Sequence, residues 1–100
     1  MHRLIQRVIQ NIKTLASEEK VRFTNKAYRE LYNLELELDE NDVYALLQDL
    51  RPHEFKHRER SKLTEEWLYV FKIEIFGVII YLKLILRKKC IIISFHEDKP

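Results

Sequence analysis

The spacing of the hydrophobic residues changes at Pro52, and this change most constrains the fold. Before Pro52, apolar residues recur at three- and four-residue steps over residues 4–15, 27–31 and 43–50, which is typical of helices with one buried face. After Pro52, apolar residues alternate with others over residues 67–75 and 79–86, and their aromatic and β-branched character favours strands. The pattern predicts an α+β fold, with two or three N-terminal helices packed on a C-terminal antiparallel sheet of three to four strands.

Polar residues mark where the helices begin. Thr24 follows a short extended piece and is predicted to cap the second helix. Asp39, with Asp42 three residues later, resembles the capping arrangement of a third helix, which Pro52 would end.

Turn signals divide the second half of the chain. Gly77, the only glycine, and the basic run at residues 87–89 predict tight turns, so that three consecutive strands form an antiparallel meander ending with residues 90–97. Residues 53–60 are a candidate edge strand, and residues 98–100 are expected to form a frayed tail.

The length and composition indicate a single globular domain over residues 1–100. A chain of 100 residues with 46% hydrophobic and 34% charged residues can build one core, so any site must lie on the surface. The net charge of +2 does not by itself argue for nucleic acid, but the charge is uneven. Residues 51–62 hold five Lys or Arg against two Glu, whereas residues 35–49 are strongly acidic.

Several classes of protein and site are excluded or disfavoured. Cys90 is the only cysteine, which excludes an internal disulfide or a multi-cysteine zinc site and suits a reducing compartment, where its expected role is core packing. No secretory signal is visible, and the apolar run at residues 78–86 is interrupted by Lys83 and is about half the length of a membrane helix. We therefore expect a cytoplasmic protein without membrane contact. No glycine-rich phosphate loop is present. His53 and His57 are four residues apart, but Pro52 and the surrounding pattern argue against the helix that would align them as metal ligands, so no metal or cofactor is expected.

Strand alternation gathers polar side chains on one face of the predicted sheet. If apolar residues of the last two strands face the helices, the opposite face carries Tyr81, Lys83, Ser94 and His96; the inward set would be Leu82, Leu84, Ile91, Ile93 and Phe95. The basic segment that contains Lys56, His57, Arg58 and Arg60 would lie beside that face. Cations and aromatic rings together suit RNA, which offers phosphates, bases for stacking and a 2′-hydroxyl. The alternatives are a charged edge that prevents strand pairing and a Tyr81 that packs in the core with its hydroxyl at the rim.

The C-terminal half resembles a known toxin family. The phrases that carry the resemblance are Glu54-Phe55-Lys56, Trp67-Leu68-Tyr69-Val70-Phe71, Ile80-Tyr81-Leu82-Lys83 and Ile93-Ser94-Phe95-His96-Glu97. In these phrases and their spacing the chain resembles the motility quorum-sensing regulator (MqsR) toxins of type II toxin-antitoxin systems. The resemblance implies a RelE-like fold and a metal-independent endoribonuclease (mRNA interferase) that cleaves messenger RNA, inhibits translation and is held inactive by a cognate antitoxin. It also implies that Lys56 and Tyr81 fall on the family's catalytic patch.

The chain departs from the family pattern at two positions. Leu68 stands where the family usually has a glutamine, and a leucine can neither donate nor accept a hydrogen bond. His96 stands where the family usually has a lysine, and a histidine can act as an acid or a base near neutral pH or as a phosphate contact.

The resulting hypothesis is a ribonuclease toxin whose partners are messenger RNA and an antitoxin. Lys56, Tyr81 and His96 are the predicted catalytic residues; the residues predicted to bind the RNA backbone are Arg58, Arg60, Lys72 and Lys83. Two alternatives stay open: a noncatalytic interaction module that retains the toxin fold, as Leu68 suggests, and an RNA-binding domain that does not cleave.

Overall fold

The computed structural model describes residues 2–99, which fold into three α-helices, one short 3₁₀ helix and five strands. The elements follow the order α1 (His2–Ser17), β1 (Val21–Phe23), α2 (Asn25–Asn33), α3 (Glu40–Gln48), η1 (Pro52–Glu54), β2 (Phe55–Arg60), β3 (Trp67–Ile75), β4 (Val78–Leu86) and β5 (Cys90–Glu97). The predicted α+β class is confirmed, and the candidate edge strand is β2.

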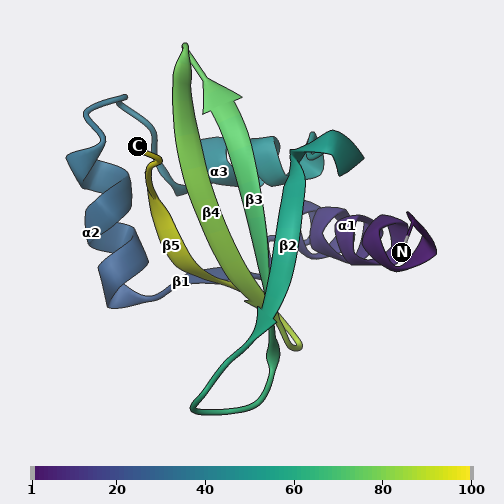
Figure 1. Ribbon diagram of the computed structural model, residues 1–100. Coiled ribbons are helices and arrows are strands. Elements are labelled where there is room, and N and C mark those ends of the chain that lie inside the picture. Colours follow the sequence, from purple (N-terminus) through teal and green to yellow (C-terminus); the bar gives the residue numbers. More distant parts are fainter. Residues whose placement is uncertain (1, 100) are drawn as a thin grey trace.

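The strands form one sheet in the order β1-β5-β4-β3-β2 (Figure 1). Strands β2 to β5 are antiparallel neighbours, as the short turns predict. The sheet has one strand more than expected because β1 also joins it, and β1 pairs with β5 in parallel, with Val21 opposite Cys90. A parallel pair needs a long connection, and here residues 24–89, about two thirds of the chain, separate the two strands. The sheet is therefore mixed.

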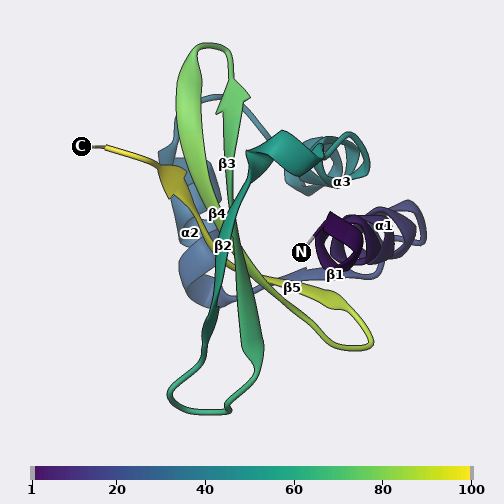
Figure 2. The ribbon, with the colours of Figure 1, turned by 45° about the vertical axis from the view of Figure 1, so that its right-hand side comes forward.

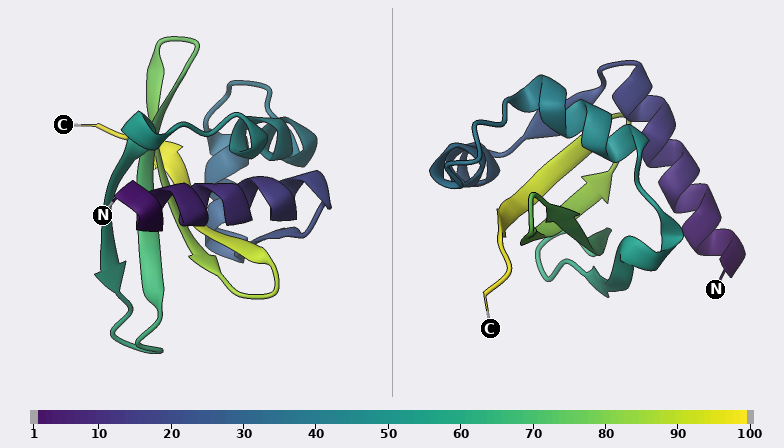
Figure 3. Two further views of the ribbon diagram at one scale, coloured as in Figure 1. Left: turned by 90° about the vertical axis from the view of Figure 1, so that its right-hand side faces the viewer. Right: turned by 90° about the horizontal axis from the view of Figure 1, so that it is seen from above.

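The core lies between the sheet and helices α1 and α3. Figures 2 and 3 show both helices on the same side of the sheet, while α2 lies along β5. Most of the largest fully buried side chains come from these helices and from the inward face of the sheet, among them Ile12, Leu47, Phe71, Leu82 and Phe95; Leu50, just after α3, is buried with them. Each contributes about 1.5–3 kcal/mol through burial. Cys90 is buried as well, in agreement with its expected role in the core. Within residues 2–99, no helix combines the length and the apolar character needed to cross a bilayer.

The predicted caps and turns are confirmed. The Thr24 side chain accepts a hydrogen bond from the Ala27 N–H at 3.1 Å, and Asp39 and Asp42 form a reciprocal capping box. The turn between β3 and β4 consists of Phe76 and Gly77, both with positive φ (52° and 80°). Two central residues with positive φ define the tight hairpin turn that matches the twist of antiparallel strands.

A bulge in β5 changes which of its residues face the core. Leu84 is opposite Ile92 and Lys83 is opposite Ser94, so Ile93 is an extra residue that shifts the alternation by one position. Cys90, Ile92 and Phe95 consequently face the helices. The prediction that Ile91 and Ile93 face the core is therefore wrong, because simple alternation does not anticipate the bulge; both residues are partly exposed outside the core.

Candidate active site

Figure 3 shows the face of the sheet that α1 and α3 leave uncovered. The strand pairing places a row of polar side chains across this face. Lys72 of β3 is opposite Tyr81 of β4, and Tyr81 is opposite His96 of β5. Directly opposed residues of antiparallel strands point to the same side, so these three side chains share the uncovered face. The Tyr81 and His96 rings stack, with centroids 5.1 Å apart and planes at 13°. Both are half-buried, so the phenol lies outside the core.

A second bulge places Lys56 at the end of this row. The pairing of β2 with β3 shifts between Phe55 and His57, which leaves Lys56 as the extra residue. Lys56 and Lys72 both line a shallow pocket of about 330 Å³. The row therefore runs through Lys56, Lys72, Tyr81 and His96 on four neighbouring strands. Neighbouring strands lie about 4.8 Å apart, so Lys56 on β2 and Tyr81 on β4 are separated by about 10 Å. The long, flexible side chain of Lys56 largely covers this distance.

Arg58 and Arg60 do not join the row. They are opposite Tyr69 and Trp67, which belong to the other alternation of β3 and point toward the helix side of the sheet. Both guanidinium groups lie over the Trp67 ring, at 3.8 and 4.3 Å from its centroid, in cation–π geometry. The structure thus divides the expected basic patch between the two faces, because successive residues of a strand point in opposite directions.

The lysines on the uncovered face differ in their carboxylate partners. The Lys72 ammonium is 3.0 Å from Asp98, and the Lys83 ammonium is 3.4 Å from Glu59 and 5.8 Å from the centre of the Tyr81 ring. Within residues 2–99, Lys56 forms no ion pair, and its side chain is exposed. Lys56 is therefore the lysine of this face that is most available to an incoming phosphate.

Asp98 was not expected to contribute. Its backbone N–H donates a hydrogen bond of 2.8 Å to the carbonyl of Ile79, which extends the pairing of β4 with β5 by one step. The expectation of a frayed tail is wrong for Asp98, which is held by this bond and by Lys72; Pro100 lies outside the described residues. No sequence signal distinguishes an ordered Asp98 from a terminal residue.

Two residues of α2 hold the strand that carries His96. The Lys26 ammonium lies 3.0 Å from the Ser94 hydroxyl and 3.0 Å from the Glu30 carboxylate. Glu30 accepts a hydrogen bond of 3.0 Å from the Phe95 N–H, which would otherwise be an unpaired donor at the sheet edge. This pair is not among the predicted site residues; its four-residue spacing on a helix is a signal for an ion pair, but not for its contact with β5.

Leu68 lies on the uncovered face between Glu59 of β2 and Ile85 of β4. Ile85 is in turn opposite Ile91. The next row contains Val70 and Lys83, and the row after it contains Lys72 and Tyr81. Leu68 is thus on the same face as Tyr81, and the hydrogen-bonding side chain along its row is that of Glu59 on β2.

Metal-binding side chains do not gather within the part of the chain that the structure describes: no group of three or more His, Cys, Asp or Glu is placed to hold an ion. The expectation of metal-independent chemistry stays a prediction.

Comparison with known proteins places the whole candidate site inside one family match. The model of the family described as "Motility quorum-sensing regulator, toxin of MqsA" matches residues 6–97, which include every strand and each residue of the row. No curated protein matches the chain.

Proposed function

The chain belongs to the motility quorum-sensing regulator (MqsR) toxin family, and on that premise we propose that it is a ribonuclease toxin that cleaves messenger RNA without a metal ion. A toxin of this family implies an antitoxin as partner. Messenger RNA as the substrate, inhibition of translation and a cytoplasmic site of action form part of the proposal.

The observation that carries the proposal is the row of Lys56, Lys72, Tyr81 and His96 on the uncovered face. In the proposed reaction the 2′-oxygen of a ribose attacks the neighbouring phosphorus and gives up its proton, while the bond to the 5′-oxygen breaks and that oxygen takes up a proton. The products are a 2′,3′-cyclic phosphate and a 5′-hydroxyl. This chemistry needs a cation at the phosphate and groups that exchange protons, and the row offers both.

We assign a role to each residue of the row. Lys56, which is exposed and has no carboxylate partner among residues 2–99, stabilises the negative charge that builds on the phosphate. Tyr81 orients the phosphate or passes a proton, and His96, held against the Tyr81 ring, acts as acid or base. Lys72 and Lys83 bind the RNA backbone on the same face. Arg58 and Arg60 bind the RNA backbone where the RNA passes around the edge strand β2. Both guanidinium groups are held beside this edge, over the ring of Trp67.

The test is a cleavage assay with the purified chain, single-stranded RNA and excess chelator. We expect cuts that leave 5′-hydroxyl ends, and a loss of rate of about 10²–10⁴-fold for Lys56→Ala, Tyr81→Phe and His96→Ala. Lys88→Ala is the matched control, because Lys88 is an exposed lysine in the turn between β4 and β5. If the folded chain neither cleaves RNA nor slows growth when produced alone, the ribonuclease proposal is wrong.

Leu68 favours a second candidate, a noncatalytic module that retains the toxin fold and acts through a partner. Between Glu59 and Ile85, the Leu68 side chain cannot form the hydrogen bonds that a glutamine would supply. Leu68→Gln separates the two candidates. A wild-type chain that cleaves supports the ribonuclease, whereas an inactive wild type that gains cleavage with Leu68→Gln supports the noncatalytic module. Salt-dependent RNA binding with intact product would instead indicate an RNA-binding domain.

A further inference from the structure

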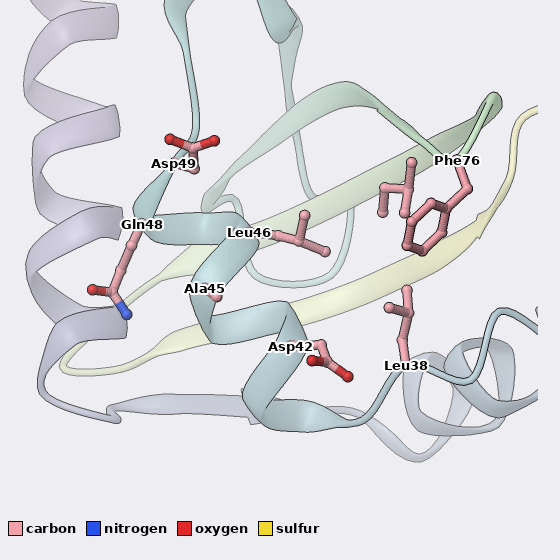
Figure 4. A pocket seen from close by; sticks show the side chains of 8 residues that line it. Leu38, Asp42, Ala45, Leu46, Gln48, Asp49 and Phe76 are labelled. Atoms are coloured by element: carbon pink, nitrogen blue, oxygen red, sulfur yellow. The ribbon is translucent and has the colours of Figure 1, made fainter.

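An apolar groove lies between α3 and the turn that joins β3 to β4, away from the lysine row. It encloses about 590 Å³. Figure 4 shows Leu46 and Leu38 pointing toward the ring of Phe76 across the groove, with Asp42 at its rim and Asp49 at the end of α3.

Phe76 adds little to the stability of the fold. Its side chain is 82% exposed, so it gains almost no burial free energy. Its φ of 52° lies in the left-handed region, where bulky side chains are disfavoured and where asparagine or glycine normally stands in such a turn. A large aromatic residue that is both strained and exposed is therefore better explained by a contact outside the chain than by folding.

Asp42 and Asp49 line the groove, and the segment that contains them is strongly acidic. Residues 35–49 contain six Asp or Glu and no Lys or Arg. Asp49 lies at the C-terminus of α3, where the helix dipole disfavours a negative charge, so this carboxylate is not explained by helix stability either. An acidic rim repels RNA and attracts a cationic partner.

We propose that this groove is the docking site for a cationic amphipathic segment of the antitoxin. The segment inserts an apolar side chain beside Phe76 and Leu46 and places Lys or Arg side chains near Asp42 and Asp49. Charge complementarity selects this occupant, because the groove presents apolar side chains together with the carboxylates of Asp42 and Asp49, and its lining, within residues 2–99, contains no cation. The inference rests on the antitoxin partner of the proposed function, but not on the ribonuclease activity.

The test measures binding of the antitoxin encoded by the adjacent reading frame to the purified chain by calorimetry. Phe76→Asn removes the aromatic anchor and creates an Asn-Gly turn, which suits two positive φ angles, so the hairpin is preserved. We expect Phe76→Asn to weaken binding at least tenfold and Asp49→Asn to weaken it two- to fivefold, with a smaller effect at high salt. Leu63→Asn is the matched control, since Leu63 is 95% exposed in the loop between β2 and β3 and should leave affinity unchanged.

A growth assay distinguishes failure of this proposal from failure of the proposed function. The Phe76→Asn chain should slow growth as the wild type does, yet should no longer be rescued by co-expressed antitoxin. If the wild-type chain is not toxic, calorimetry still tests the groove. The docking proposal is overturned if the antitoxin does not bind the wild-type chain or binds Phe76→Asn with unchanged affinity. It is also overturned if sedimentation shows that this face instead joins two copies of the chain.

Discussion

Asp98 neutralises one of the lysines that we propose for RNA binding. The Lys72 ammonium and the Asp98 carboxylate are 3.0 Å apart, with 39% and 31% of the two side chains exposed. A phosphate that binds Lys72 must therefore replace an internal carboxylate. Removing that carboxylate with Asp98→Asn should free the lysine and tighten RNA binding, although it takes away a contact seen in the folded chain.

The magnitude follows from the exposure of the pair. Partly exposed ion pairs are worth about 0.2–1 kcal/mol, and about 1.4 kcal/mol corresponds to a tenfold change in affinity, so the expected gain is about 1.4- to 5-fold. If one additional phosphate is neutralised, the salt dependence should steepen by about 0.7 in the slope of log affinity against log salt for a single strand.

The assay is fluorescence anisotropy with a 2′-O-methyl RNA that cannot be cleaved. Asp49→Asn is the matched control, because it removes the same charge at the C-terminal end of α3, on the other side of the sheet. Salt screens charges beyond about 10 Å, so this variant should leave RNA affinity unchanged. In a Lys72→Met background, Asp98→Asn should give no gain, because the lysine that it frees is gone. Equal or weaker binding by Asp98→Asn, or a gain that persists without Lys72, would refute this account of the ion pair.

Three further predictions concern stability and reactivity. Thr24→Ala removes the cap of α2 and should lower the free energy of unfolding by about 1 kcal/mol in a denaturant titration, with no change if the 3.1 Å bond is unimportant. The hydrogen bonds from Arg87 lower the pKa of Glu66 from 4.5 to about 2, so the stability difference between wild type and Glu66→Gln should persist above pH 4.5 and vanish as the pH falls toward 2. Burial raises the pKa of the Cys90 thiol to about 12; a thiol reagent should therefore modify Cys90 only as fast as the chain unfolds, and rapid modification of the native chain would contradict this.

Hydrophobic spacing was sufficient to predict most of the fold. The change of period at Pro52, the cap at Thr24 and the turn at Gly77 each reflect a local physical preference, and each prediction is confirmed. The addition of β1 could not be predicted in the same way. Residues 21–23 carry a recognisable extended pattern, but their parallel pairing with β5 depends on how a distant part of the chain packs.

The candidate site shows the limit of alternation more sharply. Alternation correctly groups Tyr81 with Lys83 on one face, because β4 is regular over these residues. It fails at Ile93, which is an extra residue in β5, and a bulge leaves no clear signal in side-chain type. Lys56 is also such a residue, so its place beside Lys72 depends on the register of β2 rather than on the sequence pattern.

The two proposed surfaces meet on a single hairpin, and this bears on how an antitoxin could silence the site. Lys72 and Tyr81 lie on the two strands that the Phe76 turn joins. Tyr81 is five residues from Phe76 along β4, which at about 3.4 Å per residue corresponds to about 17 Å. A partner anchored in the apolar groove therefore needs only a short additional segment to reach the row. That segment must cross from the acidic residues of the groove to the lysines of the row. Its groove-binding part would carry cations and its site-covering part would carry anions, which is a charge pattern that can be read directly from the sequence of the antitoxin.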